Sequence, residues 1–345
     1  MRVDFRSTHY LAYWNGRRGQ LLSYNDQMTF PRGVFTLSLD FELIWGALDK
    51  RGPDGFRKPC EIERQHVIAR LLQLFVEFKL PATWCVVGHL MLDHCDCKNG
   101  VKHPSIVPPN HSWMRDWFAH DPCGDEKSFP LFYGRSLVEK IRDCAVPQEI
   151  GSHSFSHVIF GDPGCSLETA RTELAACLEA ARELGIEMRS FVFPRNSIGH
   201  LNALRDHGFR IFRGLEPHWY NQLPSRMIQR LARLSAVFLA MEPPVGVPER
   251  TAEGLWNIPA SMLYFPMHGL RRRVPLNLRV ARARKGLDAA VRSKKIFHLW
   301  FHPTNLSDEM ETMFQGLRKI FEYASNLREQ GKLDFLPLKA LVPAE

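Results

Sequence analysis

The sequence lacks a long uninterrupted apolar run, and this absence excludes a membrane-spanning helix. None of its 345 residues falls in an apolar stretch of the length that a helix needs to cross a bilayer, about eighteen residues or more. The first twenty residues also lack the apolar core of a secretory signal. We therefore expect the protein to remain in the cytoplasm.

Cysteine is scarce as well. Eight cysteines in 345 residues are too few for a disulfide scaffold, and in a reducing compartment they serve as small core residues or free thiols. The segment DHCDCKNGVKH at residues 93–103 mixes histidine and cysteine but contains no CxxC pair. Its nearest further candidates, His111 and Cys123, are irregularly spaced. The spacing therefore does not favour a structural metal in this segment.

The chain is basic but lacks any recognisable nucleic-acid-binding motif. Its net charge is +8, and residues 271–295 alone contain ten Lys or Arg residues and one Asp. Such a patch binds an anionic surface or substrate. Because the segment has no aromatic residue and the chain has no helix-turn-helix, zinc-finger or RNA-binding signature, we expect no nucleic-acid partner. An anionic membrane surface, a substrate phosphate, and a solvated helix without a partner remain as alternatives.

Short β-rich runs alternate with amphipathic helical patterns along the chain, at 45% hydrophobic and 24% charged residues. Strands separated by helices indicate βα units and a parallel sheet, and seven or eight such units predict a closed barrel. The predicted strands lie at 34–41, 82–88, 148–154, 189–194, 209–214, 255–261, 295–303 and 333–338. The predicted helices lie at 61–80, 137–145, 166–185, 201–209 and 307–331, with Ser166 as an N-cap and Gly185 as a C-terminal stop.

Two regions interrupt this alternation within what we predict to be a single domain over residues 1–345. Residues 89–133 are rich in His, Pro, Trp and Cys and indicate a loop excursion over the top of the barrel. Residues 215–295 contain proline clusters, the amphipathic run 225–241 and the basic segment. We interpret them as an insertion or lid that faces a membrane surface, with two ordinary peripheral helices as the alternative.

Ionisable residues fall at the ends of the predicted strands, where a barrel places its functional groups. Asp40 and Glu42 are two residues apart on one strand, so that period-two alternation puts both carboxylates on the same face. Two adjacent acids are unfavourable unless a cation neutralises them. His153 and His157 lie at the exit of a later strand in EIGSHSFSH. An HxxxH pair without the glutamate of HExxH is a weak motif when taken alone.

Arg195, in FVFPRN, and His302, in HLWFHP, follow two further strands. Two neutral imidazoles, one carboxylate and a water form an open tetrahedral site that suits Zn²⁺ and tolerates Co²⁺ or Mn²⁺. A second carboxylate can then act as general base, an arginine can keep it ionised, and a histidine can protonate a departing amine. These are the groups that hydrolysis of an amide requires.

The stretches LSLDFELIWG, HSFSH, FVFPRN and FHLWFHP resemble the polysaccharide deacetylases (carbohydrate esterase family 4), in the family's order and over residues 34 to about 305. The resemblance implies a distorted (β/α)7 barrel and metal-dependent removal of N-acetyl groups from amino sugars. It also implies roles for six residues. Asp40 is similar to the catalytic base, Glu42, His153 and His157 to the metal ligands, Arg195 to the arginine paired with the base, and His302 to the general acid.

The two acids are split by Phe41, whereas the commonest form of the family has adjacent aspartates. Which acid binds the metal is therefore open, and we assign Glu42 because its side chain is longer. We predict an N-deacetylase that acts on a nucleotide- or lipid-linked amino sugar, a precursor of a surface polysaccharide.

Two other functions remain open. The same fold also serves hydrolases of small cyclic amides and ureides, and a closed cavity rather than a groove would favour that activity. An inactive carbohydrate-binding barrel is the third possibility, because Trp113, Trp117, Trp219 and Tyr220 could stack on sugar rings.

Overall fold

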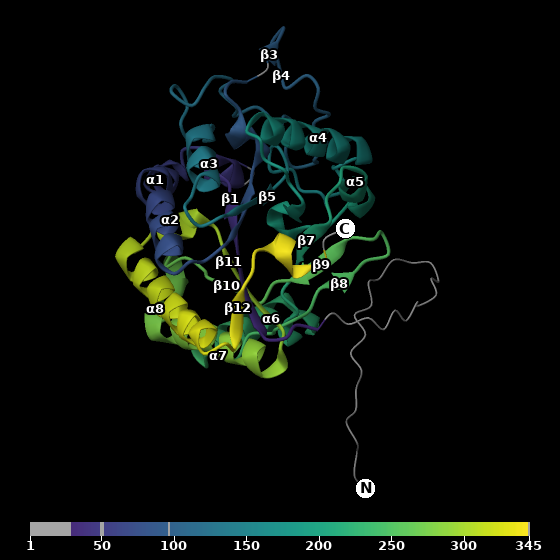
Figure 1. The fold of residues 1–345 in the computed structure, drawn as a ribbon. Helices are drawn as coiled ribbons and strands as arrows, with labels where there is room; N and C mark the ends of the chain where they lie inside the picture. The colour runs from purple at the N-terminus through teal and green to yellow at the C-terminus, as the bar shows by residue number, and fades with distance from the viewer. Residues whose placement is uncertain (1–28, 49–51, 96, 344–345) are drawn as a thin grey trace.

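The computed structural model describes residues 29–48, 52–95 and 97–343, which form a curled, mostly parallel sheet surrounded by helices (Figure 1). The sheet has the order β10-β11-β1-β2-β5-β6-β7-β9-β8, with β12 added beside β1. Its strands are β1 (Gly33–Phe41), β2 (Thr83–Val86), β5 (Glu149–Ser152), β6 (Ser190–Val192), β7 (Ile211–Gly214), β8 (Glu249–Arg250), β9 (Trp256–Pro259), β10 (Met262–Leu263), β11 (Ile296–Phe301) and β12 (Leu333–Phe335).

Strand β1 is the central element of the barrel. All nine of its residues are buried, and it pairs in parallel with β11, β2 and β12. Parallel strands are covered on both faces, so that they are rich in apolar and β-branched residues along their whole length. The sequence GVFTLSLDF fits this position until Asp40, which is only 3% exposed and therefore requires a partner of opposite charge.

The barrel closes where β9 runs into β10. Strand β9 pairs with β7, whereas β10 pairs with β11 at the other end of the sheet order. Between them, the amide of Ala260 donates to Gly214 of β7, and the amide of Ser261 donates to His298 of β11. Residues 256–263 therefore change pairing partner within a few residues, and β9 and β10 together form the seventh strand position of the barrel. The predicted distorted (β/α)7 barrel is confirmed.

The helices surround the sheet. They are α1 (Arg57–Ile62), α2 (Ile68–Glu77), α3 (Arg135–Arg142), α4 (Leu167–Glu183), α5 (Leu201–Asp206), α6 (Arg226–Phe238), α7 (Leu276–Ser293) and α8 (Met310–Glu329). In α4 the Ser166 hydroxyl accepts the amide of Thr169 at 3.0 Å, and Gly185 beyond the end has φ +67°. Both predicted end signals of this helix are confirmed. None of the described helices is long and apolar enough to cross a membrane.

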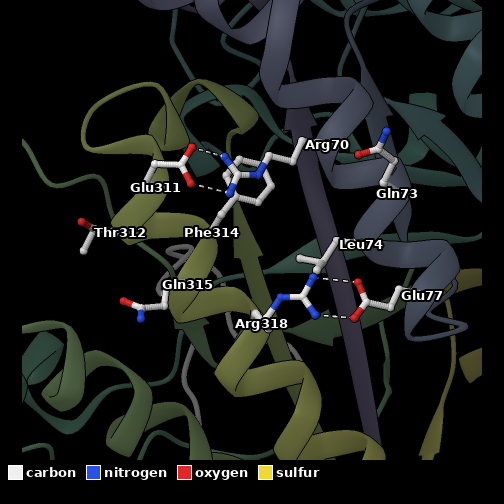
Figure 2. A pocket seen from close by; sticks show the side chains of 9 residues that line it. All are labelled: Arg70, Gln73, Leu74, Glu77, Glu311, Thr312, Phe314, Gln315 and Arg318. Atoms are coloured by element: carbon white, nitrogen blue, oxygen red, sulfur yellow. Dashed lines mark hydrogen bonds and ion pairs between the residues drawn. The ribbon is translucent and has the colours of Figure 1, made fainter.

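The predicted helix over 61–80 is interrupted by one turn of π-helix, Glu63–Val67, between α1 and α2. Figure 2 shows how α2 then packs beside α8. Arg70 forms a two-pronged ion pair with Glu311, and Arg318 forms another with Glu77. These pairs line a surface hollow of about 540 Å³. Exposed ion pairs contribute little to stability, and this hollow contains none of the predicted site residues.

The predicted loop excursion contains little regular structure apart from the two-residue strands β3 (Cys97–Lys98) and β4 (Val101–Lys102), which project at the top of Figure 1. Within residues 215–295, which we predicted to be an insertion, β9 and β10 are strands of the barrel and α7 packs on β1, β11 and α8. What lies between β7 and β9 is α6, the short turn η5 (Trp219–Gln222) and β8.

The basic segment is partly used inside the fold. Arg279 of α7 is buried and donates to the carbonyl oxygens of Phe265 and Arg271, both at 2.6 Å. Arg282 and Lys285 donate to the carbonyls that follow α6, at Met241 and Ala240. These cations cap loop carbonyls. Other cations of the segment face solvent. Arg271, Arg272 and Arg273, in the turn η6 (Gly269–Arg273), are all exposed.

Candidate active site

Ionisable side chains converge where the parallel strands end, on one edge of the barrel. Because the carboxyl ends of parallel strands lie on the same side, residues distant in sequence meet there. Asp40 and Glu42 come from the end of β1, His153 and His157 follow β5, Arg213 lies on β7, and His302 follows β11.

Glu42 is the centre of the group. Its Oε1 lies 2.9 Å from Nε2 of His153, 3.2 Å from Nε2 of His157 and 3.4 Å from Nε2 of His302. Burial alone raises the pKa of Glu42, but the surrounding histidines hold that pKa well below its usual value. Glu42 is therefore an ionised carboxylate with three imidazole nitrogens around one oxygen.

The hydrogen bond of His153 indicates what this arrangement is suited to hold. Its Nδ1 donates to the carbonyl of Val192 at 2.7 Å, which fixes the tautomer. With Nδ1 donating in this way, Nε2 is the ring nitrogen that can bind a metal ion, and it faces Oε1 of Glu42 at 2.9 Å. The ligand atoms of Glu42, His153 and His157 all lie within 4.8 Å of one another. This donor set fits a divalent metal such as zinc.

The turn that carries both histidines has an unusual backbone. Ser154 and His157 have φ of 60° and 64°, a left-handed conformation that non-glycine residues seldom adopt. The buried carboxylate of Glu173 on α4 holds this turn, because it accepts the amides of Phe155 and Ser156 at 2.9 and 2.8 Å. Sequence reasoning missed Glu173, although an acid on the buried stripe of an amphipathic helix is a signal that could have revealed it.

Asp40 is paired with a different arginine from the one we predicted. Arg213 donates to Oδ1 and Oδ2 of Asp40 at 2.6 and 2.7 Å, in the two-pronged geometry of a strong pair. Arg195 instead donates to the carbonyl of Gly46 at 2.9 Å, from a backbone with φ 57°. Burial alone raises the pKa of Asp40, but Arg213, His153 and His302 lower it overall.

The sequence did not point to Arg213 because this residue lies inside a strand, where the run FRIFRG indicates only β-structure. An arginine within a buried strand requires an acidic partner, and this was the available signal. The guanidinium of Arg213 is also held by Asn196, at 3.2 Å, and by the ring of Trp300, 4.1 Å from its centroid. Arg195 still lines the same cleft.

His302 lies at the open side of the group, with 28% of its side chain exposed. Its Nε2 is 3.4 Å from Glu42 and 3.7 Å from Asp40. Burial alone lowers the pKa of His302, but the two carboxylates raise it overall. The imidazole is thus favoured in its protonated form, with a proton available at the cleft.

Asp40, Glu42, His157 and His302 line a cleft of about 480 Å³, a volume within the range typical of small-ligand sites. Tyr220 and Arg271 line the same cleft, so that an aromatic side chain and a cation of the basic segment lie at the site. Of the other aromatic candidates, Trp219 is 54% exposed, Trp117 is buried, and Trp113 stacks on His111.

The fold has clear counterparts among solved structures. A protein from Mycobacterium smegmatis described as a candidate polysaccharide deacetylase matches with a TM-score of 0.59 and 14% identity, over 92% of this chain and 96% of that one. An allantoinase matches with a TM-score of 0.55 and 12% identity, over 94% and 96%. No protein-family model matches the sequence, and no curated protein sequence matches it. The chain therefore has the fold of the polysaccharide deacetylases, and at these identities the likeness extends to the fold alone.

Proposed function

We propose that this chain, which has the polysaccharide-deacetylase fold, is a metal-dependent hydrolase that removes an N-acyl group, most simply N-acetyl, from an amino-sugar unit. One observation carries the proposal. The buried, ionised Glu42 presents a single oxygen to the Nε2 atoms of His153 and His157, and the bond from Nδ1 of His153 to the carbonyl of Val192 aims its Nε2 at this point.

Glu42, His153 and His157 would hold the ion, and the borderline-soft N₂O donor set favours Zn²⁺ over Co²⁺ or Mn²⁺. When bound, such an ion polarises an amide carbonyl and lowers the pKa of a water. Glu42 rather than Asp40 is the ligand, because both oxygens of Asp40 already accept hydrogen bonds from Arg213.

Asp40 acts as the general base in this proposal. Arg213 keeps it ionised at neutral pH and fixes its plane, so that it can accept a proton from the attacking water. His302 faces it across the site and carries a proton, because the carboxylates raise its pKa. It can donate that proton to the departing amine nitrogen. Arg195 lines the cleft and can contribute to substrate binding.

The lining of the cleft supports a phosphate-bearing amino sugar. Arg271 gives it a cation that can meet a diphosphate, and the aromatic side chains of Tyr220 and Trp300 line it. The cytoplasmic location that we predict from the sequence would bring the protein together with such a precursor.

A small cyclic amide or ureide is the second candidate substrate. The cleft volume of about 480 Å³ suits it, and the allantoinase has the same fold. The test is a panel that contains free, nucleotide-linked and lipid-linked N-acetylhexosamines and a cyclic ureide. We expect acetate release from a phosphate-linked sugar and none from the Glu42→Gln variant. Hydrolysis of the ureide alone would replace the deacetylase assignment.

An inactive carbohydrate-binding barrel remains the third candidate. It has no need of the ion, so metal analysis of the purified protein separates it from both enzymes. We expect bound metal that is lost in His153→Ala. Sugar binding without metal and without turnover would establish the binding function instead.

We also propose that an anionic lipid surface docks beside the cleft. Helix α6 has an apolar face that no other described element covers. Its exposed apolar side chains are Met227, Ile228, Leu231, Leu234 and Phe238, and Leu239, directly after the helix, is exposed as well. Val237 on its other face packs against Phe265 and Val274, which ties α6 to the end of the turn that carries Arg271–Arg273. Apolar side chains flanked by cations are typical of a helix that lies in a membrane interface.

Sedimentation with vesicles that contain phosphatidylglycerol tests this docking surface. We expect the wild type to sediment, Leu231→Glu/Phe238→Glu to remain in solution, and Arg271→Glu/Arg272→Glu/Arg273→Glu to bind only weakly. Val101→Glu is the matched control, since Val101 is 56% exposed on the β3–β4 hairpin. A wild type that stays in the supernatant, or that covers α6 by dimerising, would remove the membrane from the proposal.

A further inference from the structure

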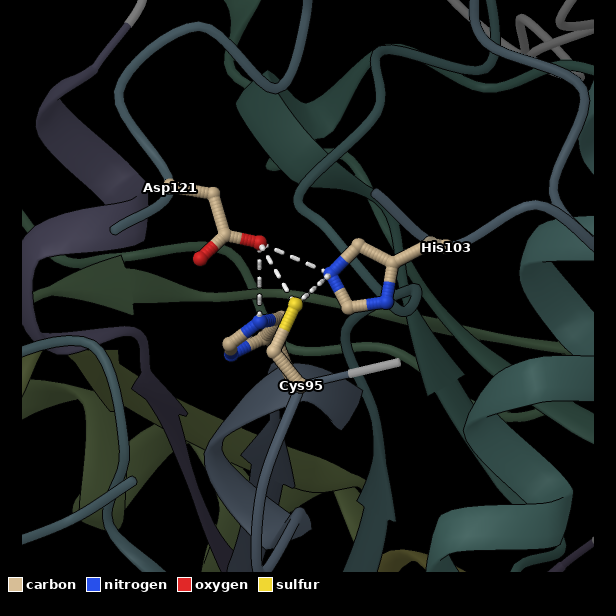
Figure 3. Close-up of side chains that lie close together, drawn as sticks. Cys95, His103 and Asp121 are labelled. Carbon is tan, nitrogen blue, oxygen red and sulfur yellow. Dashed lines mark hydrogen bonds and ion pairs between the residues drawn. The ribbon is translucent and has the colours of Figure 1, made fainter. Parts of the chain in front are cut away.

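A second group of metal-ligating side chains lies in the loop excursion. Figure 3 shows Cys95, His103 and Asp121 directed toward one point, and His89 completes the group. His89 belongs to the turn η3 (Gly88–Met91) after β2, and the other three come from the loop itself. His89, His103 and Asp121 are 0–4% exposed, and Cys95 is half-buried.

The distances within this group suit a tetrahedral ion. Sγ of Cys95 lies 3.7 Å from Nε2 of His103 and 3.8 Å from Oδ2 of Asp121, and Nε2 of His89 lies 3.3 Å from the same oxygen. Zinc bonds of about 2.0–2.3 Å place tetrahedral ligand atoms roughly 3.3–3.8 Å apart. The pair His103–Asp121, at 2.8 Å, is the one shorter edge.

His89 provides an independent observation. Its Nδ1 is bonded to the carbonyl of Phe132 at 3.0 Å, whereas its buried Nε2 has no hydrogen-bond partner. With Nδ1 donating to that carbonyl, Nε2 is the ring nitrogen that can bind a metal ion. It faces Oδ2 of Asp121 at 3.3 Å, and the side chains of both residues are fully buried. A ring nitrogen and a carboxylate that face each other in a dry site are suited to hold a cation between them.

The surroundings hold the ligands in place. The other oxygen of Asp121 accepts the amide of Cys123 at 2.9 Å. The ring of His89 packs against Trp45, Tyr133 and Phe155, with centroids 4.4, 4.8 and 5.6 Å away. Such packing and outer hydrogen bonds are what orient ligands in structural metal sites.

We propose that the loop excursion holds a structural Zn²⁺, bound by Nε2 of His89, Sγ of Cys95, Nε2 of His103 and Oδ2 of Asp121. Four protein ligands leave no open position, so this ion stabilises and does not react. The sequence did not favour a metal here because two of the ligands, His89 and Asp121, lie outside residues 93–103. Of the two further candidates named from the sequence, His111 and Cys123, His111 is not a ligand of this site, because its ring contacts Asp162 at 2.8 Å.

The ion fixes a loop that has little regular structure of its own, and this loop supports the turn of the active site. Ring centroids of His103 and Phe155 are 5.1 Å apart, and Trp117 donates to the carbonyl and hydroxyl oxygens of Ser156. Phe155 and Ser156 lie between His153 and His157. The structural ion would therefore fix the loop that packs against the turn from His153 to His157, without itself contacting substrate.

Cobalt substitution tests this site separately from the proposed active site. A Co²⁺–thiolate bond gives a charge-transfer absorption band that a ligand set without sulfur cannot give, so only the Cys95 site produces it. We expect the band in the cobalt-loaded wild type and in His157→Ala, and its loss in Cys95→Ser. Cys97→Ser is the matched control, because Cys97 is an exposed thiol of the same loop.

Metal analysis completes the test. We expect Cys95→Ser and Asp121→Asn each to lose about one equivalent of zinc that Glu42→Gln retains, with a lower Tm. If the wild type gives no thiolate band, or if the band survives Cys95→Ser and is lost in Cys97→Ser, the proposed loop site is wrong. Loss of the other equivalent in Glu42→Gln is independent of that outcome, so that the two sites can fail separately.

Discussion

The two metal-ligating groups of this chain are built in opposite ways. Glu42, His153 and His157 come from the ends of barrel strands and offer three ligands, and Glu42 and His157 border a cleft of about 480 Å³. His89, Cys95, His103 and Asp121 come mostly from an irregular loop, offer four ligands including a thiolate, and are closed off by aromatic rings. An open three-ligand site is suited to catalysis, and a closed four-ligand site to structure.

The comparison teaches that position in the fold, rather than residue type, separates the two roles. Both groups turn an imidazole Nε2 toward a carboxylate, at His153–Glu42 and at His89–Asp121. Only the first has a base and an acid beside it, in Asp40 and His302. Loss of the first should remove activity and leave the barrel folded, whereas loss of the second should lower Tm and weaken the support of the turn that carries His153 and His157.

The largest effect is expected from Glu42→Gln. Removing the carboxylate takes away the charged ligand that three imidazoles surround, so we expect hydrolysis to fall by at least about 10³-fold and one metal equivalent to be lost. Tm should fall, because the ionised carboxylate loses its favourable contacts with the histidines and the bound ion is lost. Activity assays, metal analysis and thermal melts check this. A variant that keeps its activity would show that Glu42 is not a ligand.

Asp40→Asn should rank second. The amide keeps the shape but cannot accept a proton, so we expect kcat to fall by about 10²–10⁴-fold with both metals retained. The variant also leaves Arg213 without its ionised partner and should lower Tm. Arg213→Lys is the companion, because it keeps the charge and loses the two-pronged geometry. If Arg195→Lys were far more damaging than Arg213→Lys, the revised assignment of the arginine would be wrong.

His302→Gln gives the third effect and a pH signature. His302 donates as an imidazolium, and its raised pKa keeps it protonated at neutral pH. Activity should therefore be present below that pKa and decline as the pH rises through it. The variant should lose about 100-fold in rate and also lose this alkaline decline. A pH–rate profile whose alkaline limb survives in His302→Gln would assign the acid to another group.

The smallest effect should come from Glu173→Gln. Glu173 accepts backbone amides of the turn from His153 to His157 and is a ligand in neither of the two metal-ligating groups. One amide oxygen can still accept the backbone amides of Phe155 and Ser156, but the charge is lost. We expect about a tenfold loss of activity, through weaker metal retention, with the loop zinc unchanged. Metal titration of the variant measures this. Loss of the cobalt–thiolate band in this variant would mean that the two regions are not separable.

The sequence predicted much of the barrel because local patterns determine it. Alternating strands and helices, the Ser166 cap and the Gly185 stop are short-range signals. The placement of Arg213 opposite Asp40 and of Asp121 opposite His89 depends on how strands and loops far apart in sequence come together. No spacing rule contains that information. The sequence likewise gives no information on which strands α7 packs against, and for this reason we predicted an insertion over residues 215–295, although α7 packs on β1.

Anomalous diffraction at the zinc edge, on crystals of protein purified without chelator, tests the central claim most directly. We expect one peak within bonding distance of Glu42, His153 and His157 and a second among His89, Cys95, His103 and Asp121. A map with no peak between Glu42 and the two histidines of the catalytic turn would contradict metal-dependent hydrolysis by this protein, even if the loop site were filled.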